Sequence, residues 1–136
     1  MKTNARTEDI RMLVAQKLWI ECGLEDFDEA ISLSHILYDN TISVSDFLNP
    51  TNGSIHVGND KEHPILITDA EGYVHMEYVF TEILFQRKKL TATLISQQCI
   101  RVGNRILDRL CFEVRSTRDE KPRTEDVFFD ITAGYK

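Results

Sequence analysis

The sequence predicts an α+β fold, in which helices come first and a mostly antiparallel sheet follows. The first observation behind this prediction is the N-terminal part, where apolar residues recur with the helical period. The second is the last third of the chain, where long apolar runs are separated by turn signals. The third is the composition: 136 residues with 42% hydrophobic and 28% charged residues are typical of a globular domain, and we expect a single domain over residues 1–136.

Two helices are expected in the N-terminal part. The first runs from an N-cap at Thr7 to a stop at Gly23. Its apolar stripe is formed by Ile10, Leu13, Val14 and Leu18. The second follows at once, because Asp26 and Glu29 have the spacing of a capping-box variant, and it ends near Tyr38.

A strand is expected next, from Thr41 to Leu48, where apolar and small polar residues alternate. The segment after it, 49–64, carries Asn-Pro and Asn-Gly turn signals around one short possible strand, Ser54 to Val57. Long irregular connections of this kind are often lids or binding loops.

The segment 65–89 is ambiguous, because its apolar residues fit helical spacing while 69–72 could turn a hairpin; we favour a helix from about Tyr73. Three antiparallel strands are then expected at 90–100, 105–117 and 126–135. A turn at 101–104 and a polar loop at 118–125 would join them.

Charge and cysteine content limit the function. A net charge of −6 argues against nucleic-acid binding, which needs clustered Lys and Arg. The three cysteines lack C-x-x-C spacing, so neither a disulfide framework nor a zinc site is expected, and we predict no metal and no cofactor. The first residues contain no apolar run, so we expect no signal peptide, no membrane span and a cytoplasmic location.

Two aspartates fall on apolar positions of the predicted strands, Asp46 in the strand 41–48 and Asp108 in the strand 105–117. An inward ionised carboxylate is costly unless it is paired, hydrogen-bonded or shifted in pKa, and these are the properties of a general acid or base. Alternatively, each aspartate sits at a strand end in water or pairs with an arginine across the sheet.

Other side chains are candidates for a pocket. His75 could line a cavity as a proton shuttle or hydrogen-bond donor, or be an ordinary partly buried histidine. The candidate wall residues are Trp19, Tyr38, Phe112 and Phe128, although aromatic residues more often fill a core.

The stretch "WIECGLEDFDEAISLSHILYDNTISVSDF" resembles the opening of the nuclear transport factor 2-like superfamily, which includes SnoaL-like cyclases and ketosteroid isomerases. Residues 38–46 are similar to the family's "Y-A-D-D-A-T-V-x-D-P" strand, although Phe47 replaces the proline. The resemblance implies a cone-shaped half-barrel, a curved sheet wrapped around helices, with a small apolar or partly polar ligand in its mouth. It also implies a homodimer through the outer sheet face.

By this resemblance Asp46 would be the general base, and Asp108 or His75 the acid or hydrogen-bond donor. The leading hypothesis is therefore a small-molecule-binding protein that acts as a cofactor-independent isomerase, cyclase or dehydratase. The alternative is a non-catalytic dimeric accessory or protein-interaction domain of the same fold.

Overall fold

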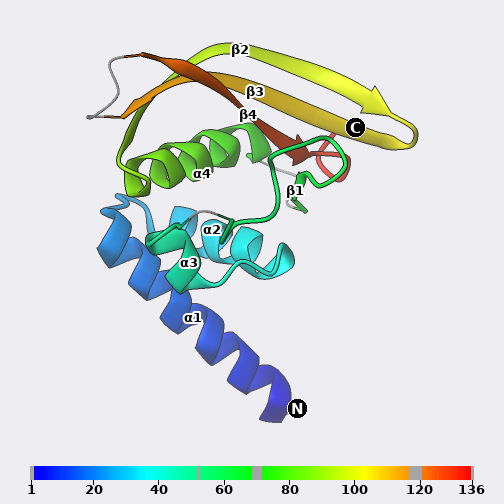
Figure 1. Ribbon diagram of the computed structural model, residues 1–136. Helices are drawn as coiled ribbons and strands as arrows, with labels where there is room; N and C mark the ends of the chain where they lie inside the picture. Colours follow the sequence, from blue (N-terminus) through cyan, green and yellow to red (C-terminus); the bar gives the residue numbers. More distant parts are fainter. Residues whose placement is uncertain (1, 52, 69–71, 117–120, 136) are drawn as a thin grey trace.

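Four helices and a four-stranded mixed sheet form the described part of the chain, so the predicted α+β class is confirmed. The computed structural model describes residues 2–51, 53–68, 72–116 and 121–135, with residues 2–10 described as backbone only (Figure 1). The elements are α1 (Lys2–Cys22), α2 (Phe27–Asp39), α3 (Val44–Leu48), β1 (Ile65–Leu66), α4 (Tyr73–Arg87), β2 (Leu90–Val102), β3 (Arg105–Ser116) and β4 (Arg123–Asp130).

The predicted capping residues mark the end of α1 and the start of α2, but not the start of α1. α1 ends just before Gly23, which has φ +63°, but it starts at Lys2, so the predicted N-cap at Thr7 is wrong. No proline or glycine precedes Thr7 to stop the helix from extending. The prediction of α2 is confirmed, because the Asp26 carboxylate accepts a hydrogen bond from the Asp28 N–H at 2.8 Å.

The predicted strand Thr41–Leu48 is wrong, because Val44–Leu48 forms the short helix α3. Ser43 is its N-cap, and the Ser43 Oγ accepts a hydrogen bond from the Asp46 N–H at 3.0 Å. A serine three residues before an acidic residue is a helix-start signal, and here it overrides the strand-like alternation. The helix buries Phe47 in the core and leaves Asp46 exposed.

Residues 54–57 in the loop after α3 form no strand, so the predicted strand at Ser54–Val57 is also wrong. Gly58 fixes this loop to the sheet, because its carbonyl accepts a hydrogen bond from the Phe128 N–H at 2.8 Å. Gly58 has φ +91°, and a Cβ there would lie 2.7 Å from the Ile65 Cδ1. Only glycine fits this approach of the loop to β1 and β4.

The predicted helix from Tyr73 and the three-stranded meander are confirmed as α4 and β2–β3–β4. Gly103, with φ +61°, is the first residue of the two-residue turn between β2 and β3, as expected for a type II′ turn. β4 covers Arg123–Asp130 and not 126–135, and the chain then turns back, where the Ile131 N–H bonds to the Ile106 carbonyl. Residues 117–120 of the predicted strand end and loop lie outside the described residues.

The sheet has the order β1-β4-β3-β2, with β1 parallel to β4 and the other pairs antiparallel. It arches over α4, and the other side of α4 faces α2 and α3 (Figure 1). α4 is therefore apolar on several sides, as a helix between two layers must be. The fully buried Phe80 joins the layers, since it packs against Phe47 and Phe129 with ring centroids 5.1 and 5.9 Å apart.

The concave face of the sheet is the face toward α4. The predicted parity of β3 is confirmed, because its buried residues on this face are Ile106, Asp108, Leu110, Phe112 and Val114. The alternate residues lie on the convex face, where Arg109 forms an ion pair with Asp126 at 2.9 Å. The position of Asp108 therefore places a carboxyl group between the sheet and α4.

Candidate functional site

Asp108 is the predicted acidic residue that the structure buries. It is 5% exposed, and β3 directs it toward α4. The Gln97 Nε2 of the neighbouring strand β2 donates a hydrogen bond to the Asp108 Oδ2 at 2.7 Å. The Tyr78 hydroxyl of α4 donates in turn to the Gln97 Oε1 at 2.6 Å. These bonds form a continuous chain from Tyr78 through Gln97 to Asp108.

Glu77 is the second acid of the site, and its side chain is 0% exposed. Burial, followed by a hydrogen bond to Asp108 and the negative charge of Asp108, raises the pKa of Glu77 to about 9. Neither Glu77 oxygen has a well-aligned hydrogen-bond partner among the described residues, so burial next to the Asp108 carboxylate is the dominant cause of this shift. Glu77 is thus protonated at neutral pH and lies beside Asp108; we call these two residues the carboxyl pair.

Further ionisable groups surround the carboxyl pair. Burial and then the charges of Asp108, Glu77 and Cys99 raise the pKa of Tyr73, which lies one helical turn before Glu77. Tyr73 is therefore a neutral hydrogen-bond donor at physiological pH. Cys99 is exposed and pairs with Asp108 in the β2–β3 register, so the carboxyl pair lies just below an open part of the concave face.

A groove of about 470 Å³ runs between α4 and the concave face of β2 and β3. It is lined by Tyr78, Thr81, Glu82, Phe85, Gln86, Leu90, Ala92, Leu94 and Phe112. Tyr78 is 38% exposed in this groove, and its hydroxyl is also the first group of the chain that ends at Asp108. A molecule in the groove would therefore contact a residue that is hydrogen-bonded toward the carboxyl pair.

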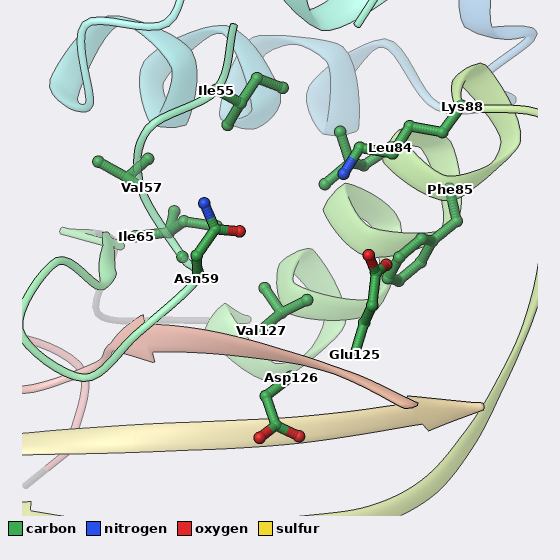
Figure 2. A pocket seen from close by; sticks show the side chains of 11 residues that line it. Ile55, Val57, Asn59, Ile65, Leu84, Phe85, Lys88, Glu125, Asp126 and Val127 are labelled. Atoms are coloured by element: carbon green, nitrogen blue, oxygen red, sulfur yellow. The ribbon is translucent and has the colours of Figure 1, made fainter. Parts of the chain in front are cut away.

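A second cavity lies on the β4 side of α4, and Figure 2 shows its lining. Its inner part has a volume of about 190 Å³, and its lining includes both apolar side chains and the polar residues Asn59, Lys88 and Glu125. It adjoins a wider, more polar space of about 340 Å³, and both are lined by Ile55, Asn59, Lys88 and Glu125. We call the two connected spaces the Lys88 cavity. The loop 49–64, which the sequence marks as a lid or binding loop, provides one of its walls.

A third cavity, of about 400 Å³, lies among α1, α2 and α3. Tyr38 lines it, and the Arg11 guanidinium lies 4.4 Å from the centroid of the Tyr38 ring. The predicted wall residue Tyr38 thus borders a different cavity from Phe112.

The structure does not bring the three predicted catalytic residues together. The inward orientation predicted for Asp46 is wrong, because Asp46 is exposed in the first turn of α3. His75 is also exposed, and its Nε2 lies 2.5 Å from the Glu29 Oε2 of α2. Among the hydrogen bonds and ion pairs of the described residues, none joins Asp46 or His75 to Asp108.

The predicted aromatic walls are separated as well. Phe112 lines the groove and packs against Phe85 with ring centroids 4.9 Å apart. Phe128 lies opposite Arg109 on the convex face, so it does not line the groove with Phe112. Trp19 is exposed on α1, and its ring packs edge-on against Phe27 at 5.3 Å, away from Phe112.

Sequence reasoning missed Glu77, although the sequence contains a signal for it. Glu77 is four residues after Tyr73 and three before Phe80, so it interrupts an apolar stripe of a helix. Asp108 interrupts an apolar strand face in the same way. These two interruptions mark two buried acidic residues, although the sequence does not show that they meet.

Comparisons with protein-family models, curated proteins and solved structures found no match to this chain. The resemblance to the nuclear transport factor 2-like superfamily therefore stays a prediction. Within the described residues, no group of three or more His, Cys, Asp or Glu side chains is arranged to hold a metal ion. In the same part of the chain, each helix is too short or too polar to cross a membrane.

Proposed function

We propose that the chain is a small-molecule-binding protein of the cone-shaped half-barrel type that acts as a cofactor-independent acid–base isomerase, cyclase or dehydratase. The observation that carries this proposal is that Tyr78 belongs both to the groove and to the hydrogen-bond chain that leads to Asp108. Its ring lines the groove, while its hydroxyl begins the hydrogen-bond chain to Asp108 and the protonated Glu77.

The chemistry that these groups support is proton transfer next to a carbonyl group. A carbonyl compound in the groove would place its oxygen at the Tyr78 hydroxyl, whose proton would turn from the Gln97 Oε1 to that oxygen and stabilise a developing enolate. Asp108 would remove the adjacent proton, and the Glu77 proton would hold Asp108 in place and limit its negative charge. Asp108 thus takes the role of base that the resemblance gave to Asp46, and Glu77 and Tyr78 take the role of acid or donor that it gave to Asp108 or His75.

The experiment uses 3-cyclohexen-1-one, a small enolisable ketone, in D₂O. Proton NMR measures the exchange of its α-protons with the wild type, Asp108→Asn and Tyr78→Phe. We expect exchange above the buffer rate with the wild type, a loss of about 100-fold or more with Asp108→Asn, and a smaller loss with Tyr78→Phe.

The control is Glu113→Gln, which removes an exposed carboxylate from the opposite face of the same strand. It should exchange the ketone at the wild-type rate. Equal rates for Asp108→Asn and Glu113→Gln would contradict the proposal.

A second candidate is the dimeric, non-catalytic domain, in which copies associate through the outer face of the sheet. In the described part of the chain no helix covers that face, and Ile95, at the bulge of the edge strand β2, is 53% exposed (Figure 1). Sedimentation equilibrium of the wild type and Ile95→Lys tests it. A dimer that Ile95→Lys dissociates favours this candidate, and a wild-type monomer at 100 μM or so rules it out.

A further inference from the structure

The Lys88 cavity carries an inference that is independent of the groove. Lys88 is the C-cap residue of α4, and its side chain extends across Leu84 toward Ile55, so that the ammonium group points into the cavity (Figure 2). None of the ion pairs among the described residues includes Lys88. The cavity therefore contains a cation without a fixed counter-charge.

The acidic residues near Lys88 are directed elsewhere or paired. The Asp126 side chain points away from the cavity, and its carboxylate binds Arg109 at 2.9 Å on the convex face (Figure 2). Glu125 lines both parts of the cavity, and its carboxylate lies 3.5 Å from the Arg123 guanidinium, whose charge offsets it. Asp126 and Glu125 are thus each paired with an arginine, whereas Lys88 has no ion-pair partner among the described residues. Its positive charge therefore attracts an anion to the cavity.

The inner part of the cavity suits an apolar group. Its walls include Val57, Ile65, Leu84, Phe85 and Val127. An apolar cavity of roughly 150 Å³ is large enough to bind benzene, so the volume of about 190 Å³ holds one six-membered ring or a short branched chain.

The loop around Gly58, which forms one wall of the Lys88 cavity, is fixed to the sheet. Gly58 bonds to Phe128 of β4 through its carbonyl and to His63 through its N–H, with N···O distances of 2.8 and 2.6 Å. The loop residues on either side of Gly58, Val57 and Asn59, are thereby held at the cavity. The Asn59 side-chain amide points into the cavity from the loop side, so it adds a second polar group to the one that Lys88 supplies from α4 (Figure 2). The site is preformed, which reduces the cost of binding.

We propose that the Lys88 cavity binds a small monocarboxylate that carries one aromatic ring or a short branched alkyl chain. The apolar group occupies the inner part, and the carboxylate accepts hydrogen bonds from Lys88 and Asn59. An uncharged alcohol of the same shape gains the apolar contacts alone, and an amine meets the like charge of Lys88. Phe85 separates this cavity from the groove, since its ring lies in the lining of both.

The test is isothermal titration of 3-phenylpropanoate into the folded protein, with 3-phenylpropan-1-ol as the uncharged ligand. The wild type is expected to bind 3-phenylpropanoate with a Kd below about 1 mM, a modest affinity suited to a ligand of this size. Lys88→Met should weaken this binding at least tenfold or so, because it removes a charge-assisted hydrogen bond, and should leave the binding of the alcohol unchanged.

The matched control is Lys89→Met, which removes the adjacent exposed lysine from outside the cavity. It should bind 3-phenylpropanoate within about twofold of the wild type, as expected for a distant surface charge. Val57→Phe fills the inner part and should weaken the binding of both ligands. Equal affinities of Lys88→Met and Lys89→Met, no saturable binding by the wild type, or unchanged binding by Val57→Phe would each overturn the proposal.

A second readout does not depend on any variant folding. In ¹⁵N-labelled wild type, 3-phenylpropanoate should shift the backbone amide resonances of Val57, Asn59 and Lys88. Saturable shifts that spare these residues would overturn the assignment of the ligand to this cavity. Since the groove shares Phe85 but none of these three residues, failure of this proposal would leave the proposed acid–base site untouched.

Discussion

Replacement of Glu77 by Gln should change how the stability of the protein depends on pH. The folded state keeps Glu77 protonated, because burial and the neighbouring Asp108 raise its pKa from 4.5 to about 9. In the unfolded chain the same carboxyl group ionises near its ordinary pKa. Between these two values the folded state binds one proton more than the unfolded state, so the free energy of unfolding falls as the pH rises.

The magnitude follows from linkage. One proton corresponds to about 1.4 kcal/mol per pH unit, so Glu77 removes about 3 kcal/mol of stability between pH 4.5 and pH 7. Because total stabilities are typically about 5 to 15 kcal/mol, this is a large effect. Gln has nearly the shape of the protonated acid and no charge to lose. As the pH rises from 5 to 8, the wild type should therefore lose stability relative to Glu77→Gln. The difference in unfolding free energy should change by about 1 kcal/mol per pH unit.

Urea unfolding at pH 5, 6, 7 and 8, followed by circular dichroism, measures this difference. The control is Glu82→Gln, which removes an exposed carboxylate from the same helix. Its stability should follow the pH profile of the wild type. If Glu77→Gln also runs parallel to the wild type, Glu77 is ionised in the folded state and the reasoning about the carboxyl pair is wrong.

Three further outcomes are expected. Gly58→Ala should lower the free energy of unfolding by about 1 to 3 kcal/mol more than Gly53→Ala. A Cβ at Gly58 would lie 2.7 Å from the Ile65 side chain, whereas a Cβ at Gly53 would meet open space. Equal shifts of the two variants in thermal unfolding would disprove this. Ellman's reagent should label Cys99 fastest, because Cys99 is exposed. Cys111 is buried, and a hydrogen bond to an aspartate of β4 and then burial raise its pKa. Preferential labelling of Cys111 would refute this order. Phe80→Ala should cost about 3 to 5 kcal/mol in urea unfolding, and a loss below about 1 kcal/mol would contradict its central place in the core.

The long elements could be predicted from the sequence because their patterns extend over ten residues or more. α4 and the strands β2 and β3 repeat their apolar period several times, and the strand ends carry turn residues such as Gly103. The same strand pattern correctly placed Asp108 between the sheet and α4. A regular period therefore predicted both the elements and one residue of the candidate site.

The segment 41–48 was mispredicted because it is short. Eight residues give only a few alternations, and the Ser43 cap was enough to start a helical turn and turn Asp46 to the solvent. The resemblance to a family strand over these residues reinforced the same error. A short strand-like pattern that contains a capping serine is thus weak evidence for an inward carboxylate.

The rest of the candidate site depends on contacts between residues far apart in the chain. Glu77 meets Asp108 only because α4 lies across β3, and Tyr78 reaches Asp108 only through Gln97 of another strand. The Lys88 cavity similarly requires the loop that Gly58 attaches to β4. Sequence periodicity indicates which face of an element is buried, but it does not indicate which residue of another element lies opposite.

A crystal structure of the protein with 3-cyclohexen-1-one tests the central proposal most directly, because that proposal places a carbonyl ligand in the groove beside Tyr78. The proposal predicts ketone density between α4 and β2, with the carbonyl oxygen about 2.6 to 3.2 Å from the Tyr78 hydroxyl. The Tyr78 hydroxyl should have turned from the Gln97 Oε1 to the ketone, and Gln97 should still donate its hydrogen bond to Asp108. Ketone density confined to another cavity, with the groove occupied only by solvent, would contradict the account.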